Sequence, residues 1–191
     1  MLIGSVLLLS LLLVPLAGGR IGELAELRPR ARWLLFAGLG VQIVIISIIP
    51  EGGRGLHAAV HLASYALLAA FLWANRDVPF LWLIALGGAL NLIAIAANGG
   101  VMPADAGAMA AAGIAKDAGA FSNSTAVADP ALLFLGDVLW VPASWPVSNV
   151  FSIGDVVIVV GAFLALHTIC GSRLALPRLA APLGPAARRP A

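Results

Sequence analysis

Two aspartates in the last third of the chain have the type and spacing of a candidate acid/base pair. Asp137 lies in LGDVLWVP, and Asp155 lies in SIGDVVIVVG, where a long apolar segment begins. A carboxylate at the edge of hydrocarbon is costly, so an acid in this position is a functional candidate. Two carboxylates brought close together share one proton, and such a pair can activate a water molecule and protonate a leaving amine.

Each aspartate also has a structural alternative. The stretch SIGD, residues 152–155, matches the capping-box pattern S/T-x-x-D/E, and an acid in the first turn of a helix interacts favourably with the helix dipole. Asp137 follows Gly136 and fits a turn. These roles can coexist with chemistry, so the sequence leaves both interpretations open.

Asparagines and tryptophans around the aspartates could bind a substrate. We expect Asn98 and Asn149 to position it, and Trp140 and Trp145, which lie between the two aspartates, to gate it. The structural alternatives are a helix C-cap for Asn98, which two glycines follow, and membrane-interface anchoring for the tryptophans. Asn91, two helical turns before Asn98, is expected to hydrogen-bond a neighbouring helix.

Two histidines form a weaker candidate site, for a metal ion. His57 and His61 are four residues apart and therefore share one face of a helix, a spacing that can hold a metal. The sequence between them, HAAVH, lacks the glutamate of a zinc-protease motif. The alternative is a solvated pair at the outer end of a helix that protonates near neutral pH. We predict no cofactor, because the chain has no glycine-rich nucleotide loop.

The elements that must position these residues are apolar helices. The chain has 191 residues, of which 61% are hydrophobic and 10% charged, and its mean hydropathy is +1.03. A soluble domain carries about 25% charged residues. A bilayer span needs about 20 apolar residues, and five segments meet this requirement: 2–19, 32–50, 57–75, 79–97 and 153–171.

The sequence therefore predicts an all-α membrane protein with five transmembrane helices. We expect a single membrane domain over residues 1–173, followed by a disordered cytoplasmic tail, 174–191, that contacts anionic lipid headgroups. Residues 98–152, between the fourth and fifth helices, are predicted to form an extracytoplasmic cap that folds back over the bundle. Such a cap could bring Asp137 close to Asp155.

The distribution of basic residues predicts the orientation in the membrane. With five spans, all but two of the 11 lysines and arginines fall on one side. Cytoplasmic loops carry the Lys/Arg excess, so the N-terminus is expected outside and the C-terminus in the cytoplasm. This is the topology of a multi-pass protein of a bacterial inner (plasma) membrane. The small positive net charge then needs no nucleic-acid partner.

Residues 132–164 resemble the catalytic region of type II (lipoprotein) signal peptidases. The similarity lies in LGDVLW with Asp137, then WPVSNVFSIGDVVIVVG with Asp155 and Gly161. The resemblance implies that Asp137 and Asp155 are the catalytic aspartates of a membrane peptidase, facing the outside. The G-N-x-x-D-R motif of those enzymes has no counterpart in this chain.

A second resemblance covers most of the chain. NGGVMP, LGDVLWVP and VFSIGDVVIVVGAF are similar to segments of an uncharacterised bacterial integral membrane family, a domain of unknown function (family 5317). This resemblance implies a membrane location and no particular activity.

Two hypotheses for the function follow. In the first, Asp137 and Asp155 form an aspartyl peptidase-like site that acts on a membrane-embedded peptide, a lipoprotein or another lipid-linked substrate. In the second, the chain is a non-enzymatic accessory subunit or binding module of a membrane complex, which docks a partner through its aromatic cap. The missing G-N-x-x-D-R motif favours the second hypothesis, and the order of the two aspartates favours the first.

Overall fold

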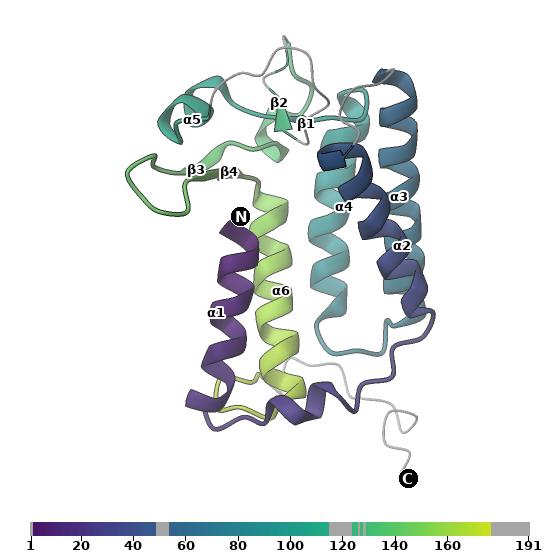
Figure 1. Cartoon of the computed structure of the whole chain (residues 1–191), viewed down its shortest axis with the longest axis vertical. Helices are drawn as coiled ribbons and strands as arrows, with labels where there is room; N and C mark the ends of the chain where they lie inside the picture. Colours follow the sequence, from purple (N-terminus) through teal and green to yellow (C-terminus); the bar gives the residue numbers. More distant parts are fainter. Residues whose placement is uncertain (1, 49–53, 115–123, 126, 128, 177–191) are drawn as a thin grey trace.

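The chain is mostly helical in a computed structural model, which describes residues 2–48, 54–114, 124–125, 127 and 129–176 (Figure 1). The α-helices are α1 (Leu2–Leu16), α2 (Arg32–Ile43), α3 (Arg54–Ala74), α4 (Leu81–Ala97), α5 (Ala106–Ala111) and α6 (Ile153–Ile169). Shorter helical turns are η1 (Ile21–Leu24), the π-helical η2 (Val44–Ile48) and η3 (Leu133–Leu135). The strands are β1 (Met102–Pro103), β2 (Ser124–Thr125), β3 (Leu139–Val141) and β4 (Asn149–Phe151).

Five apolar helices, α1, α2, α3, α4 and α6, lie where the sequence predicts its five spans. Among the described residues, α3 contains the one helical segment, Gly55–Ala74, that is long and apolar enough to cross a membrane by itself. The other four are apolar but shorter. The helical character of the five segments is thus confirmed, whereas five membrane crossings stay a prediction.

Successive apolar helices run in opposite directions. In Figure 1, α1 begins at the end of the bundle that carries α5 and the strands, and the turns after α1 and α3 lie at the opposite end. Helix α6 packs against α4 and α1, and α3 packs against α2 and α4. We name the two ends of this bundle the cap end and the arginine end. The arginine end is defined by Arg20, Arg28, Arg30, Arg32, Arg76 and Arg173.

Glycines let α4 and α6 come very close. A Cβ atom added to Gly87 would collide with the backbone of α6, 2.8 Å from the nitrogen of Ile158. A Cβ added to Gly161 would stand 2.8 Å from Cβ of Leu83 on α4. Small residues at such crossings allow two helix backbones to touch. This seam places the middle of α4 directly against the start of α6.

The cap end contains short strands, which were not predicted from the sequence. Strands β1 and β2 pair in parallel, and β3 and β4 form an antiparallel hairpin in which Trp140 lies opposite Val150. Helix α5 is short, and the Asp105 carboxylate caps it by accepting a hydrogen bond from the Ala108 amide at 2.7 Å. The chain is thus mostly helical, and the strands of two or three residues in the cap are an addition to the prediction.

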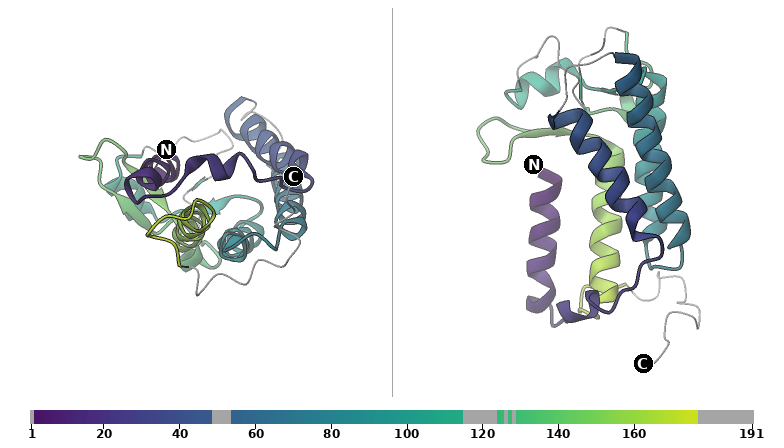
Figure 2. Two further views of the ribbon diagram at one scale, coloured as in Figure 1. Left: turned by 90° about the horizontal axis from the view of Figure 1, so that it is seen from below. Right: turned by 45° about the vertical axis from the view of Figure 1, so that its right-hand side comes forward.

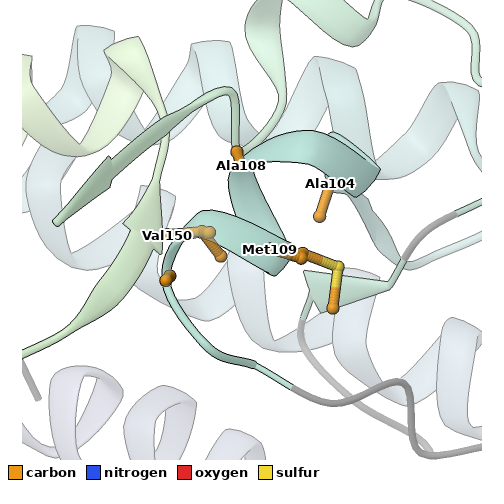
Figure 3. Packing of buried hydrophobic residues seen from close by; sticks show 5 residues of the cluster. Ala104, Ala108, Met109 and Val150 are labelled. Carbon is orange, nitrogen blue, oxygen red and sulfur yellow. The ribbon is translucent and has the colours of Figure 1, made fainter. Parts of the chain in front are cut away.

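A small apolar cluster holds the cap together. Val150 of β4 packs with Ala104 before α5 and with Ala108 and Met109 on α5 (Figure 3). All four side chains are buried. Because β4 leads directly into α6, this cluster connects the cap to the last apolar helix. The predicted tail lies outside the described residues from residue 177 onward.

Candidate functional site

Asp155 caps the start of α6. Its backbone N–H donates to Ser152 Oγ at 2.9 Å, and its own carboxylate oxygen Oδ2 accepts from the Ser152 N–H at 3.0 Å. These reciprocal bonds are the complete capping box that SIGD predicts. The structural interpretation of Asp155 is confirmed.

Asn91 on α4 closes a ring of hydrogen bonds with this capping box. Its amide nitrogen Nδ2 donates to Asp155 Oδ1 at 2.8 Å, and its amide oxygen accepts from Ser152 Oγ at 2.8 Å. Asn91 and Ser152 are buried, with exposed fractions of 7% and 0%. The prediction that Asn91 bonds a neighbouring helix is confirmed, and its partner is the predicted site residue Asp155.

Asp137 occupies a different element, beside β1. Its backbone N–H donates to the Pro103 carbonyl at 2.9 Å, and its carbonyl accepts from the Asp105 N–H at 3.1 Å. These bonds form a parallel bridge between Ala104 and Asp137. The Asp137 side chain is 3% exposed, so the residue is a buried acid at the cap end and not a solvent-exposed turn residue.

Tyr65 of α3 lies in the electrostatic field of both aspartates. The charges of Asp155 and Asp137 both act on the Tyr65 phenol. Both oxygens of Asp155, however, accept hydrogen bonds from Asn91 and Ser152. These contacts therefore give no support to a shared-proton aspartate pair.

Tyr65 was not among the site residues predicted from the sequence. Its ring packs against the His61 ring, with a centroid separation of 5.5 Å, and against the buried cluster that includes Met102. Tyr65 is the only tyrosine in the chain, and it follows His61 by one helical turn. That i, i+4 spacing on an apolar helix was the available signal.

Asn98 ties α4 to the cap. It is the C-cap residue of α4, as its Asn-Gly-Gly sequence predicts. Its amide nitrogen donates to the carbonyls of Ala94 and Ala131, each at 2.7 Å, and its amide oxygen accepts from the Ala131 N–H at 2.9 Å. The structural alternative for Asn98 is thus confirmed, and a role in substrate binding stays a prediction.

The other predicted substrate-binding residues belong to the β3–β4 hairpin. Asn149 pairs with Val141 across the hairpin. Trp140 on β3 and Trp145 in the turn are 50% and 62% exposed. This exposure fits both substrate binding and membrane anchoring, and both remain predictions for the two tryptophans.

The two histidines are not a solvated pair. His57 and His61 are 6% and 1% exposed, because the turn after α4 covers this part of α3. His61 Nδ1 lies 2.8 Å from the Gly100 carbonyl oxygen, and the left-handed Gly100 approaches Ala58 so closely that a Cβ would collide with it. The solvated alternative is therefore wrong. Within the described ranges, no three His, Cys, Asp or Glu residues group around a possible metal position.

Fold and site together define a class: a bundle of apolar helices with a small α/β cap over a buried polar cluster. A family model described as "Family of unknown function (DUF5317)" matches residues 26–167, and the chain belongs to this family. The match includes α2 to α6 and leaves out α1.

Neither the curated proteins nor the solved structures contain a match to the chain. The resemblance to type II signal peptidases has no support in these comparisons.

Proposed function

We propose that the chain is a multi-pass protein of a bacterial inner (plasma) membrane, with its N-terminus and cap outside. The observation that carries this proposal is an inverted distribution of polarity. Large apolar side chains are exposed on all five apolar helices, among them Leu12, Phe36 and Trp73, whereas Ser64 and Asn91 are buried. A soluble monomer rarely exposes apolar surface on this scale. Lipid would cover it.

The five tryptophans support the same placement. Trp33, Trp73 and Trp82 lie at helix termini of the arginine end, and Trp140 and Trp145 lie in the cap. All five are at least half exposed. Tryptophan is enriched at the two interfaces of a membrane, so two such groups fit the two edges of a bilayer.

Cysteine labelling on intact cells tests this topology. In a Cys170→Ala background, Ser144→Cys in the cap hairpin should react with a membrane-impermeant maleimide. The matched variant Glu26→Cys, at an exposed position of the arginine end, should react only after the cells are opened. Labelling of Glu26→Cys on intact cells would overturn the proposed orientation.

At the cap end, we favour a non-enzymatic binding module or accessory subunit of a membrane complex. The supporting observation is that Asp155 completes a capping box and an interhelical bond to Asn91, which is a structural role. The exposed hairpin residues Trp140 and Trp145 are the candidate docking surface. Aromatic residues are enriched in the buried centres of protein interfaces.

Native mass spectrometry of the protein extracted from its own membranes tests docking. A stoichiometric partner should be lost in Trp140→Ala/Trp145→Ala and kept in Trp33→Ala/Trp82→Ala, which removes two exposed tryptophans from the other end. A partner kept in both variants, or lost equally from both, would contradict docking through the hairpin.

A peptidase-like aspartyl site is the second candidate, and the electrostatic influence of both Asp137 and Asp155 on Tyr65 supports it. One carboxylate would take a proton from water while the other protonates the leaving amine. Turnover of a fluorogenic peptide with an apolar membrane-spanning segment should then vanish in Asp137→Asn, with the fold retained. Tyr65→Phe should shift the pH profile. Full activity in Asp137→Asn would contradict this candidate.

A further inference from the structure

Backbone hydrogen bonds join the ends of α1 and α6 at the arginine end. The Arg20 N–H donates to the Cys170 carbonyl at 2.9 Å, and the Arg173 N–H donates to the Ala17 carbonyl at 3.0 Å. Gly19 makes this junction possible, because a Cβ there would stand 2.9 Å from Ser172 Cβ and 3.1 Å from the Cys170 carbonyl oxygen. The junction therefore fixes the backbone positions of Arg20 and Arg173.

A cavity of about 290 Å³ lies at this junction. It is lined by Gly18, Arg20, Glu23, Ile169, Cys170 and Gly171. Gly18 and Gly171 both have left-handed backbone conformations, with φ of +77° and +63°, which glycine adopts without strain. The two glycines therefore end their helices without placing a side chain in the cavity.

Two guanidinium groups border the cavity. Arg20 lines it directly and forms an ion pair with Glu23. Arg173 lies over Gly18, since a Cβ added to that glycine would be 3.8 Å from Arg173 Nε. One carboxylate thus opposes two arginines, and the local charge is one positive unit. This excess matches a single negative charge.

The surroundings of the cavity match a membrane headgroup region. Ile169 forms an apolar wall, and Leu16 beside the junction is 80% exposed. The exposed tryptophans Trp33, Trp73 and Trp82 mark the same end of the bundle, which Figure 2 (left) shows from below. A basic recess next to an apolar helix surface suits a ligand with a phosphate and an acyl chain.

We propose that the α1–α6 junction binds the phosphodiester headgroup of an anionic phospholipid, held between Arg20 and Arg173. The inference rests on the proposed membrane placement and is independent of the role of the cap. It predicts a preference for phosphatidylglycerol over phosphatidylcholine, which has the same phosphodiester with a compensating positive charge.

Native mass spectrometry of the full chain in non-ionic detergent, titrated with each lipid, tests the site. The wild type should retain phosphatidylglycerol more tightly than phosphatidylcholine, and Arg20→Gln/Arg173→Gln should weaken phosphatidylglycerol binding about tenfold. The control Arg28→Gln/Arg76→Gln removes the same charge from exposed positions of the same end. It should change the affinity by less than about twofold.

A variant that is expected to increase phosphatidylglycerol affinity excludes misfolding as the explanation for a loss. Glu23→Gln removes the carboxylate that occupies Arg20 and repels a phosphate, so it should tighten phosphatidylglycerol binding several-fold. Unchanged binding in the double arginine variant, or weaker binding in Glu23→Gln, would overturn the site. An equal loss of phosphatidylglycerol affinity in the control variant would show that net charge alone explains the effect. This result would also overturn the site.

Two further outcomes separate the alternatives. Displacement of phosphatidylglycerol by excess inorganic phosphate would assign the recess to free phosphate and overturn the lipid proposal. Recovery of the wild type in the soluble fraction of lysed cells would refute the membrane placement itself. If only the proposed lipid site is wrong, the protein should still be recovered in the membrane fraction. It should then show no preference for phosphatidylglycerol over phosphatidylcholine.

Discussion

The two ends of the bundle differ in how their charged side chains are paired. At the cap end, Asn91, Ser152 and Asp155 are drawn into a ring of mutual hydrogen bonds, two of them buried. At the arginine end, Arg30 and Asp77 pair at 2.8 Å with side chains that are 61% and 55% exposed. Burial makes hydrogen-bond geometry energetically important, whereas exposure leaves a charge solvated.

This difference assigns separate tasks to the ends. The cap end stabilises the packing of α4 against α6, because each buried polar group there depends on its partner. In the proposed membrane placement, the arginine end would set the orientation and meet lipid headgroups, because its charges remain accessible. Substitutions should therefore cost much more stability at the cap end than at the arginine end.

Gly154→Ala should have the largest effect. Gly154 is the second residue of α6, and a Cβ there would collide with the Asn91 amide oxygen and stand 2.8 Å from the Gly87 carbonyl oxygen. We expect a loss of about 3 kcal/mol in unfolding free energy, measured by thermal and denaturant unfolding in detergent. Gly88→Ala on α4 is the control, because nothing lies within 4 Å of its added Cβ. Wild-type stability in Gly154→Ala would show that the seam can relax.

Asn91→Ala and Asn75→Ala compare the two ends directly. Asn91→Ala removes the donor to Asp155 and the acceptor of Ser152, with an expected cost of about 2 to 3 kcal/mol because one partner is a carboxylate. Asn75, at the arginine end, donates to the Phe71 and Arg30 carbonyls and accepts from the Arg30 N–H. Its loss affects uncharged backbone groups and should cost about 1 kcal/mol. A larger cost for Asn75→Ala would reverse the comparison.

His61→Phe should have an intermediate effect. Phenylalanine keeps a ring against Tyr65 but leaves the buried Gly100 carbonyl without the His61 hydrogen bond. We expect a loss of about 1 to 2 kcal/mol, read from the unfolding midpoint. His61→Gln can restore a donor and should recover part of this loss. No recovery would mean that ring packing, and not the hydrogen bond, joins α3 to the turn after α4.

Arg30→Gln should have the smallest effect. It removes the exposed ion pair with Asp77, for which we expect less than about 1 kcal/mol. High salt should erase the difference between the variant and the wild type, because exposed charges are screened. A cost equal to that of Asn91→Ala, unaffected by salt, would remove the distinction between the two ends.

The sequence predicts well whatever depends on neighbouring residues. The apolar helices begin and end within a few residues of the predicted spans, apart from α2, which ends as an α-helix at Ile43 and continues as η2 to Ile48. The capping box needs only the four residues from Ser152 to Asp155, and the C-cap at Asn98 needs only the glycines that follow it. Both are confirmed.

Contacts between distant segments could not be predicted. The hydrogen bond between Asn91 and Asp155 depends on how far α6 slides along α4, which the glycines of the seam determine in three dimensions. The bridge between Ala104 and Asp137 likewise depends on strand register in the cap. For the same reason the spacing of Tyr65 from His61 could not reveal that the charges of Asp137 and Asp155, from separate elements, act on its phenol. The burial of His57 and His61 depends on a turn about 40 residues away.

The packing of α1 has a consequence for biogenesis. Apart from the neighbouring η1, α1 packs mainly against α6, and the junction at Arg20 and Arg173 completes this pair. A nascent chain that has emerged through α4 already contains the partners α2, α3 and α4. In the proposed membrane placement, α1 would enter the bilayer long before its partner α6 is synthesised, so it would wait in lipid or on the insertion machinery until synthesis is almost complete. A chain truncated before α6 would leave α1 without its packing partner.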